Sequence, residues 1–308
     1  MSRFLRVIAF LLIFVLIVPA AHCQKKKSGA SALKKQIGAY QKAFFAAAQK
    51  VVRAKMKGVN GVEIMQWQQE CRAARSGDLT KEMIEQTVLP AFRNICDACW
   101  VEPSEVLEGN EKLRASRDAL LENAATWDTI ATEPVISRIE TDPPAPPTLQ
   151  QVVEQIEFDC ILYSYAASPQ GRKVAMFNQA QTFSIDLQEA RCASATNRYR
   201  IFLGLEPQFV DRGLCAVSRD HSKDMCTLGF FSHESPVEGK KSFSQRAERM
   251  GVKKAASENI FAGSSDGFAA ADAWFHSPGH HKNMLNDNPR MGVGRFEKHY
   301  TQMTGWSL

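Results

Sequence analysis

The sequence lacks three features that would assign a chain directly to a functional class. It contains no uninterrupted apolar run of the roughly 20 residues that a helix needs to cross a membrane. It contains no internal repeat. It also has no block of basic residues dense enough to cover many phosphates, since the formal net charge is only +5 over 308 residues. We therefore expect no transmembrane helix in the mature chain and no nucleic-acid partner.

The positive charge that is present lies at the N-terminus. Residues 1–31 hold five basic residues and no acidic residue. Residues 32–186 hold 17 basic and 20 acidic residues, and residues 187–308 hold 16 and 13. The rest of the chain is therefore close to neutral.

The first residues have the pattern of a secretory signal peptide. Arg3 and Arg6 precede twelve apolar residues, 7–18, and small residues follow before Cys23. A basic start, a short apolar stretch and small residues at the cleavage site are typical of a cleaved export signal, which we place at residues 1–23. An uncleaved anchor and a lipid-modified Cys23 are the alternatives. We expect the mature protein to be secreted or extracytoplasmic, in the periplasm or cell envelope.

Export changes what the eight cysteines imply, because disulfide bonds persist outside the cytosol. Removal of Cys23 leaves seven, so at least one thiol stays unpaired within the chain. Cys215 and Cys226 cannot pair with each other if they share a helix, because they would lie about 16 Å apart. We expect disulfides, but their connectivity cannot be read from the sequence.

Helical spacing dominates the first half of the chain. Apolar residues recur three and four positions apart through residues 24–142, which predicts a helical domain of unknown function. Its first residues, 24–33, are rich in Lys, Ser and Gly and predict an exposed leader. Prolines are concentrated at residues 143–148, which predicts an extended linker. A helical lead-in is expected at residues 149–186.

Two capping boxes mark helix starts, Thr148 with Gln151 and Asp186 with Glu189, and Gly204 is a natural helix end. After Gly204 short helices and strands alternate, which suggests helices on both faces of a small sheet. We expect helices at 211–227, 242–250 and 266–276, and strands at 258–262, 291–296 and 300–306.

Histidine is the residue type with the most uneven distribution, since six of the seven lie between positions 221 and 299. His221 lies within a predicted helix and reads as a structural residue. His276 and His280 have the spacing of two metal ligands on one helix, but Pro278 and Gly279 break that helix. A metal site would have to be assembled by the fold.

Two other patterns are poor evidence for catalysis. Residues 263–267 fit Gly-x-Ser-x-Gly, but too little chain follows to supply the acid and histidine of a nucleophile elbow. Cys96 and Cys99 fit Cys-x-x-Cys without a surrounding strand–helix–strand unit, so we expect structural cysteines.

Seven short strings in one order resemble the CAP superfamily of SCP-like domains, which includes cysteine-rich secretory, antigen 5 and pathogenesis-related proteins. The likeness is to the bacterial-type extracytoplasmic branch, over residues 187–308. The strings are NRYR at 197–200, DHSKDM at 220–225, FFSHESP at 230–236, ENI at 258–260, WFHSPGH at 274–280, MGVG at 291–294 and TQ at 301–302.

The resemblance implies an α/β fold, a three-layer α-β-α sandwich at the C-terminus preceded by the all-helical N-terminal region. It also implies a cavity lined by two histidines and usually two acidic residues, which binds a divalent metal in some members. His233, Glu258 and His280 match three of these positions, and Ser277 stands where the second acid is expected.

We therefore expect a secreted or envelope-associated protein that binds through its cavity and is not an enzyme. The ligand would be a divalent cation such as zinc, or a small molecule, and we expect no catalytic residue and no organic cofactor. A metal-dependent hydrolase using the same cavity and a lipid- or sterol-binding protein are the alternatives. An envelope or extracellular protein, or a lipid, is the expected partner.

Overall fold

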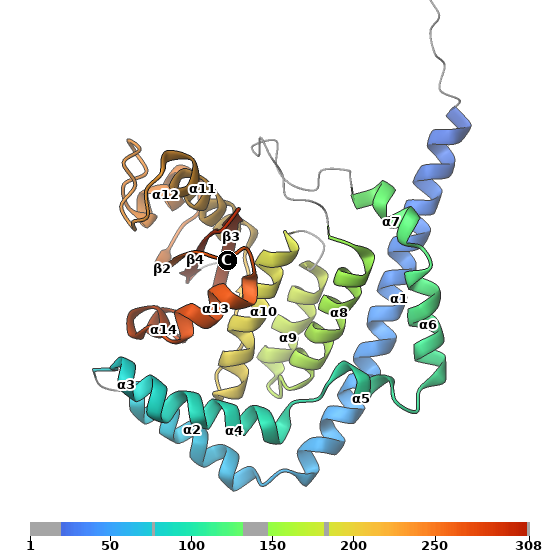
Figure 1. The fold of residues 1–308 in the computed structure, drawn as a ribbon, viewed down its shortest axis with the longest axis horizontal. Coiled ribbons are helices and arrows are strands. Elements are labelled where there is room, and N and C mark those ends of the chain that lie inside the picture. Colours follow the sequence, from blue (N-terminus) through green and yellow to red (C-terminus); the bar gives the residue numbers. More distant parts are fainter. Residues whose placement is uncertain (1–19, 76–77, 132–146, 182–184, 307–308) are drawn as a thin grey trace, which may run out of the picture.

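The structure is a computed structural model that describes residues 20–75, 78–131, 147–181 and 185–306 (Figure 1). Nearly all of the predicted signal peptide and the first four residues of the predicted linker lie outside the described residues. Within the described residues, no helix combines the length and the apolar character that crossing a membrane requires.

The N-terminal region is helical, as expected. A long first helix, α1 (Ala20–Gly58), is followed by shorter helices that pack along it or continue away from its C-terminal end (Figure 1). These are α2 (Gly61–Arg75), α3 (Lys81–Met83), the π-helical turn η1 (Ile84–Val88), α4 (Leu89–Cys99), α5 (Pro103–Leu107), α6 (Glu111–Leu121) and α7 (Ala124–Ala131).

The expected leader at residues 24–33 is part of this first helix. Leu33 is buried with a relative exposure of 2%, and it begins an apolar stripe that continues through Ile37, Tyr40 and Phe44. The composition therefore did not indicate the helix, although residues 31 and 32 are exposed as expected.

Three helices connect this region to the C-terminal part: α8 (Leu149–Ser164), α9 (Pro169–Gln181) and α10 (Leu187–Phe202). Both predicted capping boxes are present. Thr148 Oγ1 accepts from the Gln151 amide at 3.2 Å, and Gln151 Oε1 accepts from the Thr148 amide at 3.0 Å. Helix α10 ends where Gly204 takes a positive φ of 74°.

The C-terminal part is an α-β-α sandwich around a four-stranded sheet of order β1-β3-β4-β2. Strand β1 runs parallel to β3, and the other pairs are antiparallel. Helix α11 packs on one face, and α10 with α13 covers the other (Figure 1).

The helices and strands of this part have the following bounds: β1 (Phe209–Val210), α11 (Arg212–Leu228), α12 (Phe243–Arg249), β2 (Ala255–Ala262), α13 (Gly267–Phe275), α14 (Pro278–Met284), β3 (Arg290–Phe296) and β4 (His299–Gly305).

The glycines of the MGVG string let α11 lie directly on strand β3. A Cβ atom at Gly292 would be 2.3 Å from the Cys215 amide nitrogen, and one at Gly294 would be 1.9 Å from that of Arg219. Both distances are far below van der Waals contact. The Gly-x-Gly spacing is therefore a packing requirement, since alternate residues of a strand point to the same face.

One hydrophobic cluster extends from the N-terminal helices into the sandwich. The Phe92 ring of α4 lies 4.7 Å from the ring of Tyr199 on α10 and 5.6 Å from that of Phe275 on α13. Buried residues of α2, α4, α10, α13 and β3 belong to this same cluster. The predicted domain boundary at residues 142–143 lies outside the described residues and stays a prediction.

The seven cysteines whose side chains the structure describes are all free thiols: Cys71, Cys96, Cys99, Cys160, Cys192, Cys215 and Cys226. The expectation of disulfide bonds is wrong for them. They are spread over five helices and five are buried, where cysteine packs as a small apolar residue. Burial raises the pKa of the Cys96 and Cys215 thiols to about 12, so the reactive thiolate is scarce.

Candidate functional site

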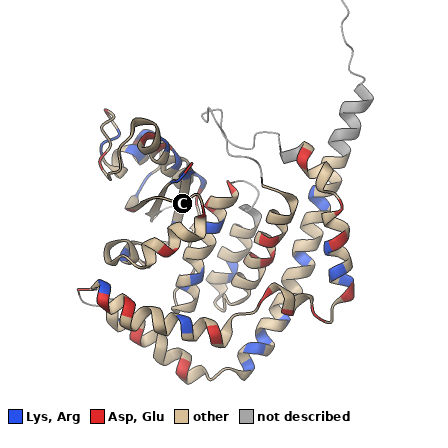
Figure 2. Cartoon of the chain, in the orientation of Figure 1, with Lys and Arg blue, Asp and Glu red and all other residues tan. Residues whose placement is uncertain are grey.

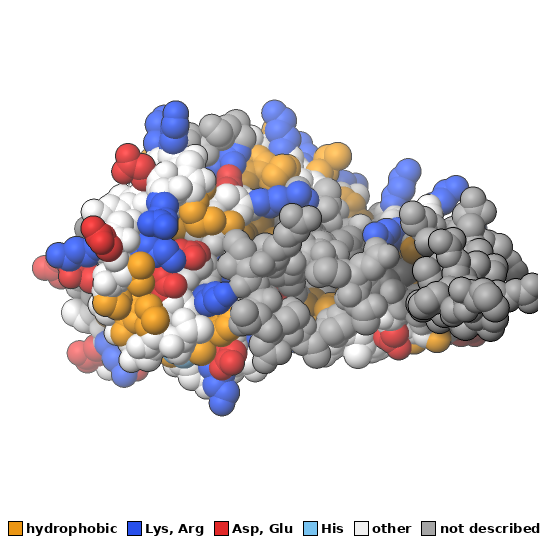
Figure 3. Space-filling model, turned by 90° about the horizontal axis from the view of Figure 1, so that it is seen from above, with side chains coloured by type: hydrophobic (Ala, Val, Ile, Leu, Met, Phe, Trp, Pro, Cys, Tyr) orange, Lys and Arg blue, Asp and Glu red, His pale blue; other side chains and the backbone are white. Residues whose placement is uncertain are grey.

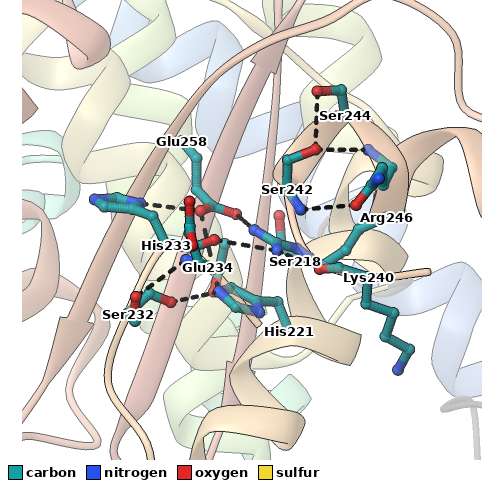
Figure 4. Close-up of polar contacts among 12 residues, drawn as sticks. Ser218, His221, Ser232, His233, Glu234, Lys240, Ser242, Ser244, Arg246 and Glu258 are labelled. Carbon is teal, nitrogen blue, oxygen red and sulfur yellow. Dashed lines mark hydrogen bonds and ion pairs between the residues drawn. The ribbon is translucent and has the colours of Figure 1, made fainter. Parts of the chain in front are cut away.

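The fold brings together the three residues that the sequence singled out. His233 lies in the loop between α11 and α12, Glu258 lies on β2, and His280 lies on α14. His233 Nδ1 is 3.0 Å from Glu258 Oε1, and the rings of His233 and His280 are 6.4 Å apart between centroids. Figure 4 shows the side chains of His233 and Glu258 pointing toward each other.

Glu258 is the buried centre of this site. Its side chain is 1% exposed, and both carboxylate oxygens have partners. Oε1 accepts from His233 Nδ1, and Oε2 accepts from Arg246 Nη2 at 2.5 Å. His221 Nε2 lies 4.0 Å from Oε1 on the remaining side. These contacts hold the buried carboxylate in one orientation.

Arg246 connects Glu258 to the loop that carries His233. It lies on α12 and is 1% exposed. Its Nη1 donates to the carbonyl oxygens of His233 at 3.2 Å, of Lys240 at 2.9 Å and of Lys241 at 3.3 Å. The guanidinium therefore fixes the loop backbone and the carboxylate at the same time (Figure 4).

A second set of ion pairs holds the same loop against α11. Lys240 Nζ lies 2.7 Å from a carboxylate oxygen of Asp220 and 2.8 Å from one of Asp224. These contacts join the far end of the loop to the helix that also carries His221. The loop around His233 is thus held from two directions, although His233 itself has a side chain that is 54% exposed.

His221 forms a wall of the site. It is fully buried, and its Nε2 donates to the Ser232 carbonyl at 3.1 Å. Nδ1 is buried without a partner among the described residues. Burial lowers the pKa of this imidazole, so it is neutral at pH 7. The sequence prediction of a hydrogen-bonded structural histidine describes this bond, but it did not place His221 beside Glu258.

His280 is positioned by a short network between α14 and β2. Asn259 Nδ2 donates to the His280 carbonyl at 3.1 Å, and Asn283 Nδ2 donates to the Glu258 carbonyl at 3.1 Å. Burial and the neighbouring His233 lower the pKa of the His280 imidazole. At pH 7 it is therefore neutral and carries a free lone pair, the form that binds a metal.

His276 and Ser277 lie between α13 and α14, and among the described residues neither bonds to His233, Glu258 or His280. The chain leaves α13 after Phe275 and begins α14 at Pro278, so His276 and His280 do not share a helix, as expected. His276 Nδ1 donates to the Asp272 carbonyl of its own helix at 2.7 Å. Ser277 is the N-cap residue of α14 and makes no side-chain capping bond.

A ready-made metal cage is absent from the part of the chain that the structure describes: no three His, Cys, Asp or Glu side chains are grouped to hold a cation. The two imidazoles nevertheless suit a cation. The bond from Nδ1 to Glu258 leaves Nε2 as the free nitrogen of His233, and His280 lies next to it.

Comparison with known proteins identifies the family of the C-terminal α-β-α sandwich. Residues 193–304 match the cysteine-rich secretory protein family, CAP. The C-terminal part of the chain is a CAP domain. The CAP domain contains all three residues discussed above, and the match begins within α10 and ends within β4.

Three relatives come from Bacillus. The chain is 33% identical over 155 residues to the uncharacterized membrane protein YlbC of Bacillus subtilis, covering 50% of this chain and 43% of that protein. It is 35% identical over 116 residues to the uncharacterized protein YkwD of the same organism, covering 37% and 44%. A crystal structure of an extracellular protein containing an SCP domain from Bacillus anthracis is 35% identical, with a TM-score of 0.38, and covers 39% and 40%. The chain spans under half the length of these relatives.

Proposed function

We propose that this protein is an exported binding protein whose CAP domain holds a divalent cation, such as zinc, between His233 and His280. The observation that carries the proposal is the 3.0 Å bond between His233 Nδ1 and Glu258. A metal-binding histidine characteristically donates its other ring N–H to a carboxylate, which fixes the tautomer and raises the basicity of the metal-binding nitrogen. The export half of the proposal rests on the signal-peptide pattern of residues 1–23.

Glu258 has a different role here from the one the resemblance implied. Each Glu258 oxygen already accepts one hydrogen bond, Oε1 from His233 and Oε2 from Arg246, so a cation at this carboxylate would have to share it with these two donors. The charge of Arg246 also opposes a cation placed at Oε2. We therefore assign Glu258 to orienting His233, while water or a bound ligand completes the coordination of the cation.

This arrangement favours binding over hydrolysis. A metal hydrolase needs a general base beside the bound water, and a base must accept a proton. Both oxygens of Glu258 already accept hydrogen bonds, from His233 and from Arg246, so a bound water would have to compete with these donors for the carboxylate. Ser277 replaces the second acid, so no carboxylate is supplied from the start of α14. When bound, the cation would offer an open coordination position to an oxygen ligand.

The test is zinc titration of the full-length protein after treatment with a chelator, followed by calorimetry. We expect one zinc ion per chain and at least about a tenfold loss of affinity in His233→Ala and in His280→Ala. Glu258→Gln should also weaken binding by about 10–100-fold, because the orienting acceptor is weakened.

His276→Ala is the matched control, because His276 lies four residues before His280 in the sequence but bonds to Asp272 of α13. It should bind zinc like the wild type. Equal zinc affinity in the wild type, His233→Ala and His280→Ala would contradict the proposal.

A further inference from the structure

Helix α1 has an unusual charge composition. Its 39 residues include ten basic residues and no acidic residue. After the run Lys25–Lys27 and the pair Lys34–Lys35, the remaining cations are spaced along the helix. Figure 2 shows Lys and Arg along the described part of α1 without any Asp or Glu. Elsewhere the two signs are mixed, as on the face of the molecule in Figure 3.

The helix gathers five of these cations on one side, which we call the basic face: Lys35, Lys42, Lys50, Arg53 and Lys57. At 100° per residue they fall within an arc of about 80°, and they extend over about 33 Å. All five are exposed. The opposite side of the helix is buried, with Leu33, Ile37, Tyr40, Phe44, Ala48 and Val52 in one hydrophobic cluster.

The basic face is not neutralised within the molecule. Among the described residues, none of its five side chains forms an ion pair with a carboxylate, whereas Lys55, on the side of the helix, pairs with Glu105 at 3.3 Å. Helix α6, which packs beside α1, carries three basic and two acidic residues and adds no net negative charge. Small residues such as Ala39, Ala43 and Ala46 separate the cations, so the basic face can approach a flat surface closely.

We propose that the basic face binds the anionic headgroups of a phospholipid membrane. A straight array of cations about 33 Å long complements a flat, negatively charged surface. Only Pro19 separates the apolar residues 7–18 from α1, so export of the chain delivers the start of the helix to the membrane surface. This interaction is independent of the metal site, which lies in the CAP domain.

The experiment is sedimentation of the full-length protein with phosphatidylcholine vesicles, with and without phosphatidylglycerol. Neutral vesicles measure any contribution of the apolar N-terminus, which is the same in all variants. The wild type should bind the anionic vesicles more tightly, and added salt should weaken this binding. Each basic side chain near an anionic surface contributes about fivefold in affinity. The variant K35Q/K42Q/K50Q/R53Q/K57Q should therefore lose about 100-fold or more.

A matched variant removes the same charge from exposed lysines elsewhere: K112Q/K173Q/K253Q/K282Q/K298Q. It should keep most of the binding to anionic vesicles. Glutamine has nearly the helix propensity of lysine, and circular dichroism checks that both variants fold. Three results would each overturn the proposal: equal binding by the wild type and the basic-face variant, an equal loss in the matched variant, or binding of soluble polyphosphate without binding of anionic vesicles.

Discussion

The ion pair between Arg246 and Glu258 should be one of the most costly contacts in the CAP domain to break. Neither side chain is exposed to a meaningful extent, at 0% and 1%, so water neither screens the pair nor replaces a lost partner. Arg246→Met leaves a buried carboxylate without its cation and removes the donor to three loop carbonyls. The cost of leaving one such charge unpaired is about 3–5 kcal/mol.

A double-mutant cycle separates this ion pair from simple loss of packing. Glu258→Gln keeps the size of the side chain but leaves the Arg246 charge unpaired, so it should also cost about 3–5 kcal/mol. In the double variant neither buried charge is left unpaired. Its cost should therefore be smaller than the two single costs together by at least about 2 kcal/mol.

Urea unfolding followed by circular dichroism measures these free energies. Arg249→Met is the control, because Arg249 is on the same helix and exposed, and its substitution should change the free energy of unfolding by less than about 0.5 kcal/mol. Additive costs in the cycle, or a loss in Arg249→Met equal to that in Arg246→Met, would refute the assignment of Arg246 to this role.

Two further predictions concern packing and pH. Gly294→Ala should destabilise the protein by about 3 kcal/mol or more in urea unfolding, because its Cβ would lie 1.9 Å from the backbone of α11. The control is Gly38→Ala, which has open space around it and should not destabilise the protein. Because burial lowers the pKa of His221, the unfolded chain binds more protons below pH 6.5, so the free energy of unfolding should fall as the pH decreases from 6.5. That pH dependence should be weaker in His221→Gln, and an unchanged slope would contradict the burial argument.

The elements of the fold that depend on local signals could be predicted from the sequence. The capping boxes at Thr148 and Asp186 each satisfy amides of their own first turn, so three or four residues contain the whole interaction. The missed elements lack such signals. Strand β1 is only two residues long and exists because it pairs with β3, 81 residues later in the chain. Helix α14 begins at the Pro278-Gly279 pair that argued against a helix.

The residues of the candidate site also divide into those that the sequence identified and one that it did not. His233, Glu258 and His280 were found through the family resemblance, because no sequence spacing brings a loop, a strand and a helix together. Arg246 was missed, although one signal was available. It lies three residues after Phe243 and next to the buried Ala247, on the apolar side of a helix that begins with a capping box. A charge in that position must find a buried partner, and that partner is Glu258.

The shared hydrophobic cluster implies that the CAP domain of this chain depends on the helices before it. Phe275 stacks on Tyr199 at 3.7 Å between ring centroids, and Phe92 of α4 covers both rings. The same Phe275 ring lies 4.5 Å from His281, whose Nδ1 donates to the Phe275 carbonyl at 2.7 Å. His281 is the neighbour of His280 on α14. The N-terminal helices therefore connect to the helix that carries His280 through Phe92, Phe275 and His281. Removing them would expose the apolar surface of Tyr199 and Phe275, while the bonds of Asn259 and Asn283 would still tie α14 to β2.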